Sequence, residues 1–237
     1  MNESMNSEEN QLLGHDIKDG EFQRTTSQFR HWVTREGKAG TGDEAGFRAE
    51  DQRYHLYVSY ACPWAHRCLI YRQLKGLESM IGLSVVHWYM GAESWTFEAG
   101  DGVIPDINGD STLAETYQRA KPGCSDVVTV PVLWDKQRNT IVNNESAEII
   151  RMFNSAFNDI GANGLDFYAP ADRQKIDAIN ERVYSTINNG VYRAGFAQTQ
   201  AAYEKAVLAL FDSLDWLEQI LSGQRYLVGD YLTEADL

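Results

Sequence analysis

The chain has 237 residues, of which 43% are hydrophobic and 11% aromatic, enough to build the core of one large domain or two ordinary ones. Its formal net charge is −13 and no stretch gathers basic residues, so we expect neither a nucleic-acid partner nor binding to an anionic membrane. No run of 18 apolar residues predicts a membrane span, and the first ten residues are polar and acidic, unlike a secretory signal or a transit peptide.

The first 50 or so residues show no sustained period of 2 or 3.6, so we expect an extension or a wrapping loop there. Three large apolar side chains lie within it, Phe22, Phe29 and Trp32, and a fully disordered tail seldom carries such residues. Part of this extension is therefore expected to pack on the folded body.

The next stretch predicts a βαβ unit. Residues 54–59 alternate in polarity as a strand does, residues 64–75 have a helical pattern that Gly76 can end, and residues 83–90 predict a second strand. Two strands joined through a crossover helix pair in parallel, so the sheet should be partly parallel.

A cysteine lies between the first strand and the helix. Pro63 suits the first turn of a helix because its φ is fixed near the helical value and it has no N–H, which places Cys62 at the helix N-terminus. The free N–H groups and the positive end of the helix dipole favour a thiolate there, lowering the pKa from about 8.5 toward roughly 3.5–7.5. Cys62 is therefore the candidate nucleophile, and the alternative is a buried, unreactive cysteine.

The other cysteines do not complete a redox pair. Ala65 stands three residues after Cys62, so a mixed disulfide on Cys62 must be resolved from outside. Cys68 projects about 120° away around the helix, and we interpret it as a packed or inert thiol. Cysteines at 62, 68 and 124 form neither a disulfide framework nor a metal-ligand spacing, so we expect a cytoplasmic protein without a metal.

After a polar insertion at about 91–126, residues 127–134 and 140–142 predict the two strands of a hairpin. Pro131 is out of place in a central strand unless it stands at the strand's start, and a cis Val130–Pro131 bond would serve that purpose. The Asn-Asn-Glu-Ser stretch at 143–146 then predicts the cap of a helix over 147–153.

From Pro170 onward the pattern predicts helices only. One helix runs to about residue 187 and is broken at 188–190, and a longer one spans about 199–221 and ends at Gly223. The longer helix carries a stripe that we interpret as core packing, formed by Val207, Leu210, Phe211, Leu214, Leu217 and Leu221. A capping pair of Thr233 and Asp236 opens another helix just as the sequence stops, so we expect a fragment of a longer protein.

This order of elements resembles the glutathione transferase superfamily. The resemblance implies an extension over 1–50, an α/β thioredoxin-like glutathione-binding domain over 51–156, and an incomplete all-α domain over 165–237. More narrowly, about residues 15–237 look like the glutathionyl-hydroquinone reductases, or xi-class glutathione transferases. The similarity lies in five motifs: Cys-Pro-Trp-Ala at 62–65, Trp-Thr-Phe at 95–97, Thr-Val-Pro-Val-Leu-Trp-Asp at 129–135, Asn-Asn-Glu-Ser at 143–146 and Asn-Gly-Val-Tyr-Arg-Ala-Gly-Phe-Ala at 189–197.

The resemblance implies a glutathione site on four residues. The backbone of Val130 would pair with the cysteinyl part of glutathione, and Trp95 would cover the peptide. At the next helix N-terminus, Ser146 would take the γ-glutamyl carboxylate and Glu145 the ammonium group. Each feature also has a purely structural reading: Glu145 and Ser146 could be only a cap, Trp95 only core, and Pro131, next to Val130, only an edge-strand residue.

The resemblance also implies an enzyme in which Cys62 is the nucleophile and Tyr192 the acid/base on the aromatic substrate. Alternatively, Tyr192 is an aromatic packed between helices. His66 is interpreted as polar surface and His87 as a satisfied core histidine.

One departure from the family concerns a Gly-Arg pair that often precedes the Val-Thr-Val-Pro run. This sequence has Asp126 and Val127 there, so a cationic contact to a glutathione carboxylate is lost or comes from elsewhere. Arg119 and Lys121 are the nearby candidates.

The function implied is removal of glutathione from glutathionyl-hydroquinones by thiol exchange, with glutathione as co-substrate and the full-length protein a homodimer. A nearer alternative is an omega-like thiol transferase or dehydroascorbate reductase, which would use Cys62 and the same glutathione site without Tyr192. The other alternative is a non-catalytic binding module with this fold, which would have no need of a thiol at a helix N-terminus.

Overall fold

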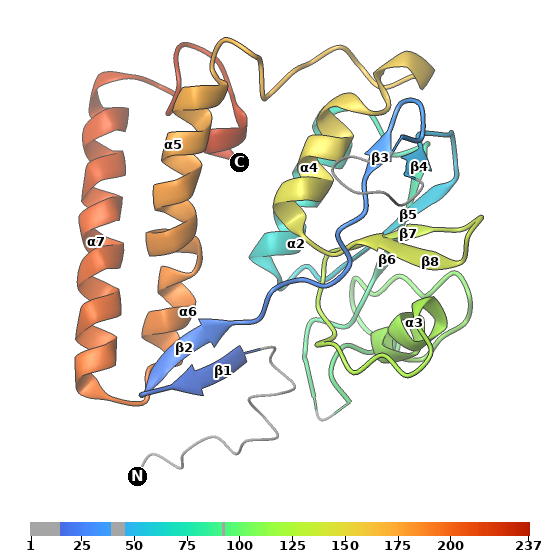
Figure 1. The fold of residues 1–237 in the computed structure, drawn as a ribbon, viewed down its shortest axis with the longest axis horizontal. Coiled ribbons are helices and arrows are strands. Elements are labelled where there is room, and N and C mark those ends of the chain that lie inside the picture. Colours follow the sequence, from blue (N-terminus) through green and yellow to red (C-terminus); the bar gives the residue numbers. More distant parts are fainter. Residues whose placement is uncertain (1–14, 39–45, 92) are drawn as a thin grey trace. The chain divides into compact units, whose positions relative to one another are not determined.

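The computed structural model describes residues 15–38, 46–91 and 93–237, which form two compact units (Figure 1). Of the described residues, those within 26–165 form one unit, and residues 15–25 join 166–237 in the other. The stretch expected to be an extension therefore contributes to both units. Each unit is described by itself below.

The unit of residues 26–165 is built on a four-stranded sheet in the order β6-β5-β7-β8. Its strands are β5 (Tyr54–Val58), β6 (Ile81–Val85), β7 (Val132–Asp135) and β8 (Thr140–Asn143). β5 pairs in parallel with β6 and antiparallel with β7, and β7 pairs antiparallel with β8, so the predicted mixed sheet and hairpin are confirmed.

The helices of this unit lie on both faces of the sheet. α2 (Pro63–Leu74) and α4 (Ser146–Ser155) pack against each other on one face, with α3 (Leu113–Ala120) on the other (Figure 1). A short 3₁₀ turn, η1 (Asn158–Ile160), follows α4. α3 lies inside the stretch predicted to be only a polar insertion, and its signal was a capping box of Thr112 and Glu115.

The predicted bounds of two strands are wrong at the loop ends. β6 ends at Val85 rather than at residue 90, and β7 begins at Val132 rather than at 127. The Val130–Pro131 bond is cis, as predicted, and Pro131 lies just before β7, where the missing N–H costs the ladder nothing. Residues 127–130 were predicted as strand because they are mostly apolar, but they do not pair with a neighbouring strand.

Strand β5 is the centre of the core. All five of its residues are buried, and the residue before it, Arg53, forms a bidentate ion pair with the fully buried Asp135 at the end of β7. Burying both charges is costly unless they pair with good geometry, so this contact ties the register of β5 to that of β7. A second buried cation, Lys75, donates to Asn158 Oδ1 and to the carbonyls of Asn163 and Leu165.

Part of the N-terminal stretch packs, as expected. β1 (His15–Lys18) and β2 (Glu21–Arg24) form an antiparallel hairpin in the unit of residues 166–237, and Phe22 is buried there. In the other unit, β3 (Val33–Thr34) pairs in parallel with β4 (Phe47–Arg48).

The second unit is helical apart from its hairpin. It contains α5 (Arg173–Val183), a π-helical turn η2 (Tyr184–Asn188), α6 (Gly190–Gly195), α7 (Gln200–Gly223) and the 3₁₀ turn η3 (Glu234–Asp236). The break predicted at 188–190 coincides with the end of η2 at Asn188 and a turn at Asn189, after which α6 begins at Gly190; the Asn189 N–H donates to the Tyr184 carbonyl. The capping pair of Thr233 and Asp236 is confirmed.

The stripe on α7 is only partly core. Leu210 is buried and Val207 and Leu217 are half-buried, but three members of the stripe are exposed: Phe211, Leu214 and Leu221. Within the described part of this unit, one side of α7 packs on α6 and the π turn. The apolar stripe extends beyond this contact. The spacing of apolar residues predicted the helix correctly, but fewer of the side chains in its stripe are buried than we expected.

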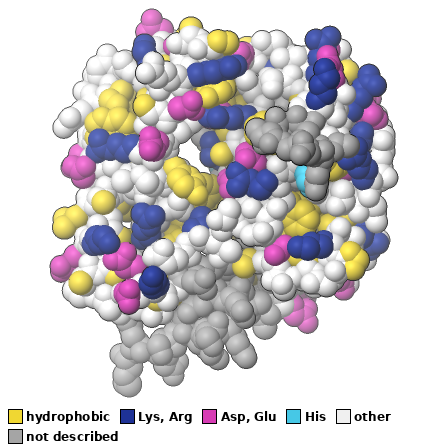
Figure 2. All heavy atoms as spheres, viewed as in Figure 1, with side chains coloured by type: hydrophobic (Ala, Val, Ile, Leu, Met, Phe, Trp, Pro, Cys, Tyr) yellow, Lys and Arg dark blue, Asp and Glu magenta, His cyan; other side chains and the backbone are white. Residues whose placement is uncertain are grey.

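No helix among the described residues is long and apolar enough to cross a membrane. On the face drawn in Figure 2, the Lys and Arg side chains are interspersed with Asp and Glu side chains.

The core histidine is His55, and the prediction for His87 is wrong. His87 follows the end of β6 and is half-buried, accepting the Tyr89 N–H on its Nδ1. His55 is buried on β5, and its Nε2 lies 2.8 Å from the hydroxyl of Ser84, which itself donates to the Pro105 carbonyl. Burial lowers the pKa of His55 from 6.5 to about 4, with a smaller contribution from the positive charge of Lys136.

The depressed pKa of His55 predicts a specific acid sensitivity. The unfolded chain binds a proton on this ring below about pH 6.5, whereas the folded chain resists it until about pH 4, so stability present at neutral pH is lost as the pH falls through this window. Between pH 7.5 and 4.5, the free energy of unfolding measured in urea should fall by about 2–3 kcal/mol more for the wild type than for His55→Gln. The exposed His66→Gln variant should follow the wild type, and parallel pH profiles for wild type and His55→Gln would contradict the prediction.

Candidate active site

Cys62 lies where β5 gives way to α2, as predicted. It is the N-cap residue of α2 with extended backbone angles, φ −100° and ψ 114°, and Pro63 is the first helical residue. A tight turn leads into it: the Cys62 N–H donates to the Ser59 carbonyl at 3.1 Å, and the Ala61 N–H to the Ser59 hydroxyl at 3.3 Å. Cys62 thus stands at the N-terminus of α2, where the helix dipole favours an anion, and its side chain makes no capping hydrogen bond.

The backbone of Val130 lies next to Cys62. The Cys62 sulfur is 3.5 Å from the Val130 carbonyl oxygen, to which the thiol donates. The sheet register produces this proximity, because Val132 pairs with Tyr57 near the end of β5, and the cis bond precedes that pair on the neighbouring strand. The structure therefore brings together two residues that the sequence predicted for the site.

The three cysteines are all free thiols, in different environments. Cys62 is half-buried, whereas Cys68 is fully buried with its sulfur 3.8 Å from the Trp64 carbonyl and 3.9 Å from the Ser146 carbonyl. Burial raises the pKa of the Cys68 thiol, and burial is also the largest cause of the raised pKa of Cys124. The predicted packing of Cys68 is confirmed, and Cys62 is the thiol best placed to react.

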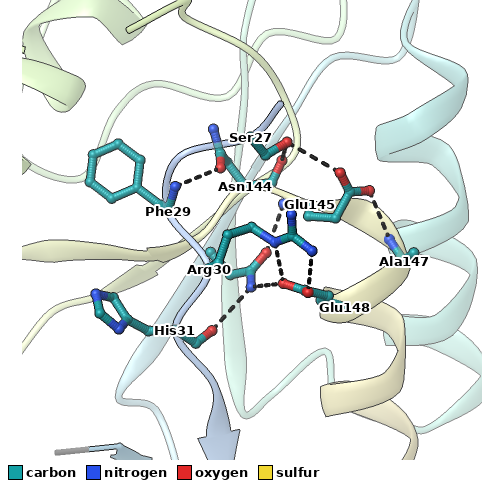
Figure 3. Close-up of polar contacts among 9 residues, drawn as sticks. Ser27, Phe29, Arg30, His31, Asn144, Glu145, Ala147 and Glu148 are labelled. Atoms are coloured by element: carbon teal, nitrogen blue, oxygen red, sulfur yellow. Dashed lines mark hydrogen bonds and ion pairs between the residues drawn. The ribbon is translucent and has the colours of Figure 1, made fainter. Parts of the chain in front are cut away.

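Glu145 and Ser146 form the start of α4. Glu145 is the N-cap residue, and its Oε1 accepts the Ala147 N–H at 3.4 Å while its Oε2 accepts the Ser27 hydroxyl at 3.2 Å (Figure 3). The Ser146 hydroxyl is buried and has no hydrogen-bond partner among the described residues. A buried hydroxyl without a partner retains a free donor and acceptor at a helix N-terminus, a position that favours an anion.

Trp95 is fixed at the start of α3. Its carbonyl accepts the Leu113 N–H at 2.9 Å, and the next residue, Thr96, bridges to Thr112. The Trp95 side chain is half-buried, and it has no hydrogen bond or ring contact with Cys62, Val130 or Glu145 among the described residues. Its expected role as a wall over the peptide stays a prediction.

The two cations that could replace the family's arginine are both engaged by carboxylates. Arg119 forms an ion pair with Asp110, and Lys121 Nζ lies 3.6 Å from Asp126 Oδ2. Asp126 also accepts the Cys124 thiol at 3.3 Å, so it stabilises the loop that leads to Val130.

Tyr192 lies on α6 in the other unit, within an aromatic cluster. Its ring stacks on Phe22 and Phe196, with ring centroids 5.8 and 6.2 Å away. The guanidinium of Arg24 lies over the Tyr192 ring, 4.4 Å from its centroid, and donates through Nε to the side chain of Asn189. The hairpin strand β2 thus supplies both an apolar and a cationic neighbour to the predicted acid.

Arg24 and Ser27 are the supporting residues that sequence reasoning missed. The bond from Arg24 to Asn189 spans 165 positions and the bond from Ser27 to Glu145 spans 118. No periodicity or capping signal connects positions so far apart. No group of three or more His, Cys, Asp or Glu side chains that could hold a metal ion is found in the part of the chain that the structure describes.

Known proteins resemble this chain over most of its length. The family described as glutathione S-transferase, N-terminal domain, matches residues 61–156. Glutathionyl-hydroquinone reductase PcpF of Sphingobium chlorophenolicum is 56% identical over 214 residues, covering 90% of this chain and 68% of the relative. Glutathionyl-hydroquinone reductase YqjG of Escherichia coli strain K12 is 55% identical over 223 residues, covering 92% of this chain and 67% of the relative.

Two solved structures have the same fold. The glutathione-bound structure of YqjG has a TM-score of 0.85 at 55% identity, covering 87% of this chain and 68% of that one. The glutathione S-transferase Xi of Phanerochaete chrysosporium has a TM-score of 0.84 at 51% identity, covering 90% of this chain and 72% of that one. The chain thus spans about two thirds of its relatives' length, and with more than half of the aligned residues identical to two glutathionyl-hydroquinone reductases it belongs to that family, the xi class of glutathione transferases.

Proposed function

We propose that this protein is a glutathionyl-hydroquinone reductase, which removes glutathione from a glutathionylated hydroquinone and releases the hydroquinone and oxidised glutathione. The observation that carries the proposal is the half-buried Cys62 thiol at the start of α2, 3.5 Å from the carbonyl that precedes cis Pro131, in a chain of this family. Three free cysteines suit a reducing compartment, and we place the protein in the cytoplasm, where glutathione is available.

Glutathione would bind between the starts of two helices and the turn before β7. The Val130 backbone would pair with the cysteinyl part of glutathione, which brings its sulfur to Cys62. The Ser146 hydroxyl and the N–H groups of α4 would take the γ-glutamyl carboxylate, and the Glu145 carboxylate the ammonium group. Support comes from the Ser146 hydroxyl, which has no partner among the described residues, and from the glutathione-bound relative. Trp95 would cover the peptide.

The first chemical step is attack of the Cys62 thiolate on the sulfur of the glutathionyl-hydroquinone. A sulfur–sulfur bond forms between Cys62 and glutathione, and the bond from that sulfur to the ring carbon breaks with its electron pair on the carbon. The Tyr192 phenol donates its proton to that carbon, so the hydroquinone leaves and the phenolate recovers a proton from solvent. The thiol is oxidised to the disulfide and the ring carbon is reduced.

The second step returns the enzyme to its starting state. A glutathione thiolate attacks the mixed disulfide at the glutathione sulfur, which releases oxidised glutathione and the Cys62 thiolate. Ala65 stands where a Cys-x-x-Cys enzyme would have its resolving cysteine, so the second thiol comes from glutathione. The two half-reactions give ping-pong kinetics.

The surroundings of Tyr192 suit a proton donor. The Arg24 guanidinium lies over the Tyr192 ring, 4.4 Å from its centroid, and places a positive charge beside the phenol. Stacking on Phe22 and Phe196 limits rotation of the ring. These contacts support Tyr192 as the acid in preference to a ring that only fills space.

Replacement of Cys62 should abolish turnover. In Cys62→Ser the hydroxyl is not appreciably ionised at neutral pH and cannot form the mixed disulfide, whereas Cys124→Ser should leave the reductase activity close to wild type. After exposure of the wild type to oxidised glutathione, peptide mass spectrometry should find the adduct on Cys62. An adduct chiefly on Cys68 or Cys124 would contradict the assignment.

Replacement of Tyr192 should separate the reductase from a simple thiol transferase. Tyr192→Phe keeps the stacked ring but loses the acid, so hydroquinone release should slow by about 10²–10⁴-fold. Thiol transfer to a small mixed disulfide should fall only a few-fold, because a thiolate leaves without a proton donor.

The exposed Tyr203 of α7 provides the matched control, and Tyr203→Phe should retain both activities. Equal losses on both substrates in Tyr192→Phe would indicate structural damage, and no loss on either would favour the thiol transferase.

A further inference from the structure

Residues 26–31, which we call the strap, run alongside the chain that leads into α4. The Asn144 N–H donates to the Phe29 carbonyl at 3.1 Å, and the Phe29 N–H donates back to Asn144 Oδ1 at 3.2 Å. The His31 N–H donates to the Val142 carbonyl at 3.0 Å. Main-chain and amide contacts therefore fix the strap to Val142 and Asn144, just before Glu145. Figure 3 shows the contact between Phe29 and Asn144.

The strap makes different contacts with the two carboxylates at the start of α4, Glu145 and Glu148. Glu148, in the first turn, forms a bidentate ion pair with Arg30 and also accepts from the Asn143 amide at 2.7 Å. Glu145 faces a neutral hydroxyl instead: the Ser27 Oγ lies 3.2 Å from Glu145 Oε2, and 3.4 Å from its second acceptor, the Asn144 carbonyl oxygen. In the described part of the chain no Lys, Arg or His side chain forms an ion pair with Glu145. One acidic charge is thus paired with a cation of the strap, and the other is oriented by the strap and has no ion-pair partner among the described residues.

The two hydrogen bonds to Glu145 orient its carboxylate and leave part of its capacity to accept hydrogen bonds free. Ser27 holds Oε2 and the Ala147 N–H holds Oε1, whereas an ionised carboxylate can accept about four hydrogen bonds. The remaining lone pairs suit a cation that arrives with a ligand. Because the side chain is already held in one place, the ligand does not have to order it on binding.

We propose that Ser27 is a positioning residue for recognition of the α-ammonium group of glutathione, acting through the Glu145 carboxylate. The inference rests on the proposed function, which places the γ-glutamyl end of glutathione at the start of α4. The strap keeps the Ser27 hydroxyl on Oε2, and Arg30 is occupied by Glu148, so the charge of Glu145 is reserved for the ligand. The N-terminal segment thereby takes part in substrate selection.

The test compares binding of two peptides by isothermal titration calorimetry. One is glutathione, and the other is glutaryl-cysteinylglycine, which lacks only the α-amino group. The wild type should prefer glutathione, and Ser27→Ala should reduce that preference about three- to tenfold, the value of one hydrogen bond. The loss should fall on glutathione, with the Kd of the amino-free peptide within about twofold of wild type.

Three further variants separate positioning from general damage. Ser27→Thr keeps a hydroxyl and should restore the preference, and Ser155→Ala, the same change at the far end of α4, should leave it unchanged. In a Glu145→Gln background, Ser27→Ala should change the preference less than twofold, because its effect passes through the carboxylate.

Equal weakening of both peptides in Ser27→Ala would overturn the proposal, and so would an unchanged preference or a full effect in the Glu145→Gln background. A wild type that binds glutathione but shows no preference over the amino-free peptide would overturn it while leaving the proposed function standing. A wild type that binds neither peptide would overturn the proposed function, and this inference with it.

Discussion

The pairing of strand β5 on both of its edges is the constraint on which the site depends. Its five buried residues leave it no freedom to slide, and the buried ion pair of Arg53 with Asp135 ties it to β7. The chain leaves β5 directly into the turn that holds Cys62, and β7 begins directly after Val130 and cis Pro131. A thiol and a carbonyl from distant parts of the sequence are therefore held 3.5 Å apart by the register of one strand pair.

Helix starts provide the second organising feature. α2 and α4 pack side by side on one face of the sheet, and each begins with a candidate site residue, Cys62 on α2 and Glu145 on α4. The buried Cys68 lies between them, with its sulfur near the Ser146 carbonyl. The N-terminus of α2 favours the thiolate form of Cys62, and the N-terminus of α4 is where we propose that the ligand's carboxylate binds.

The N-terminal segment supports both halves of the chemistry that we propose. Its hairpin brings Arg24 and Phe22 to Tyr192 within one unit, and the strap brings Ser27 and Arg30 to the start of α4 within the other. Residues of the N-terminal stretch, which has no helix or strand periodicity, thus contact candidate site residues in both units. Such contacts orient the groups to which we assign reaction and binding, which gives the large apolar and charged side chains of this stretch a role.

The sequence by itself determined the elements that obey local rules. Pro63 after Cys62 placed the thiol at a helix N-terminus, Gly76 ended that helix, and Pro131 indicated the cis bond, because each signal acts through the backbone of its immediate neighbours. The Thr112 capping box would have revealed α3 by the same logic. The tertiary structure alone decided that His55 rather than His87 is buried, that Phe211 on α7 stays exposed, and that Arg24 and Ser27 support Tyr192 and Glu145. The physical reason is that burial and long-range hydrogen bonds depend on which surfaces meet, and a local pattern specifies a face of a helix or strand without specifying what covers it.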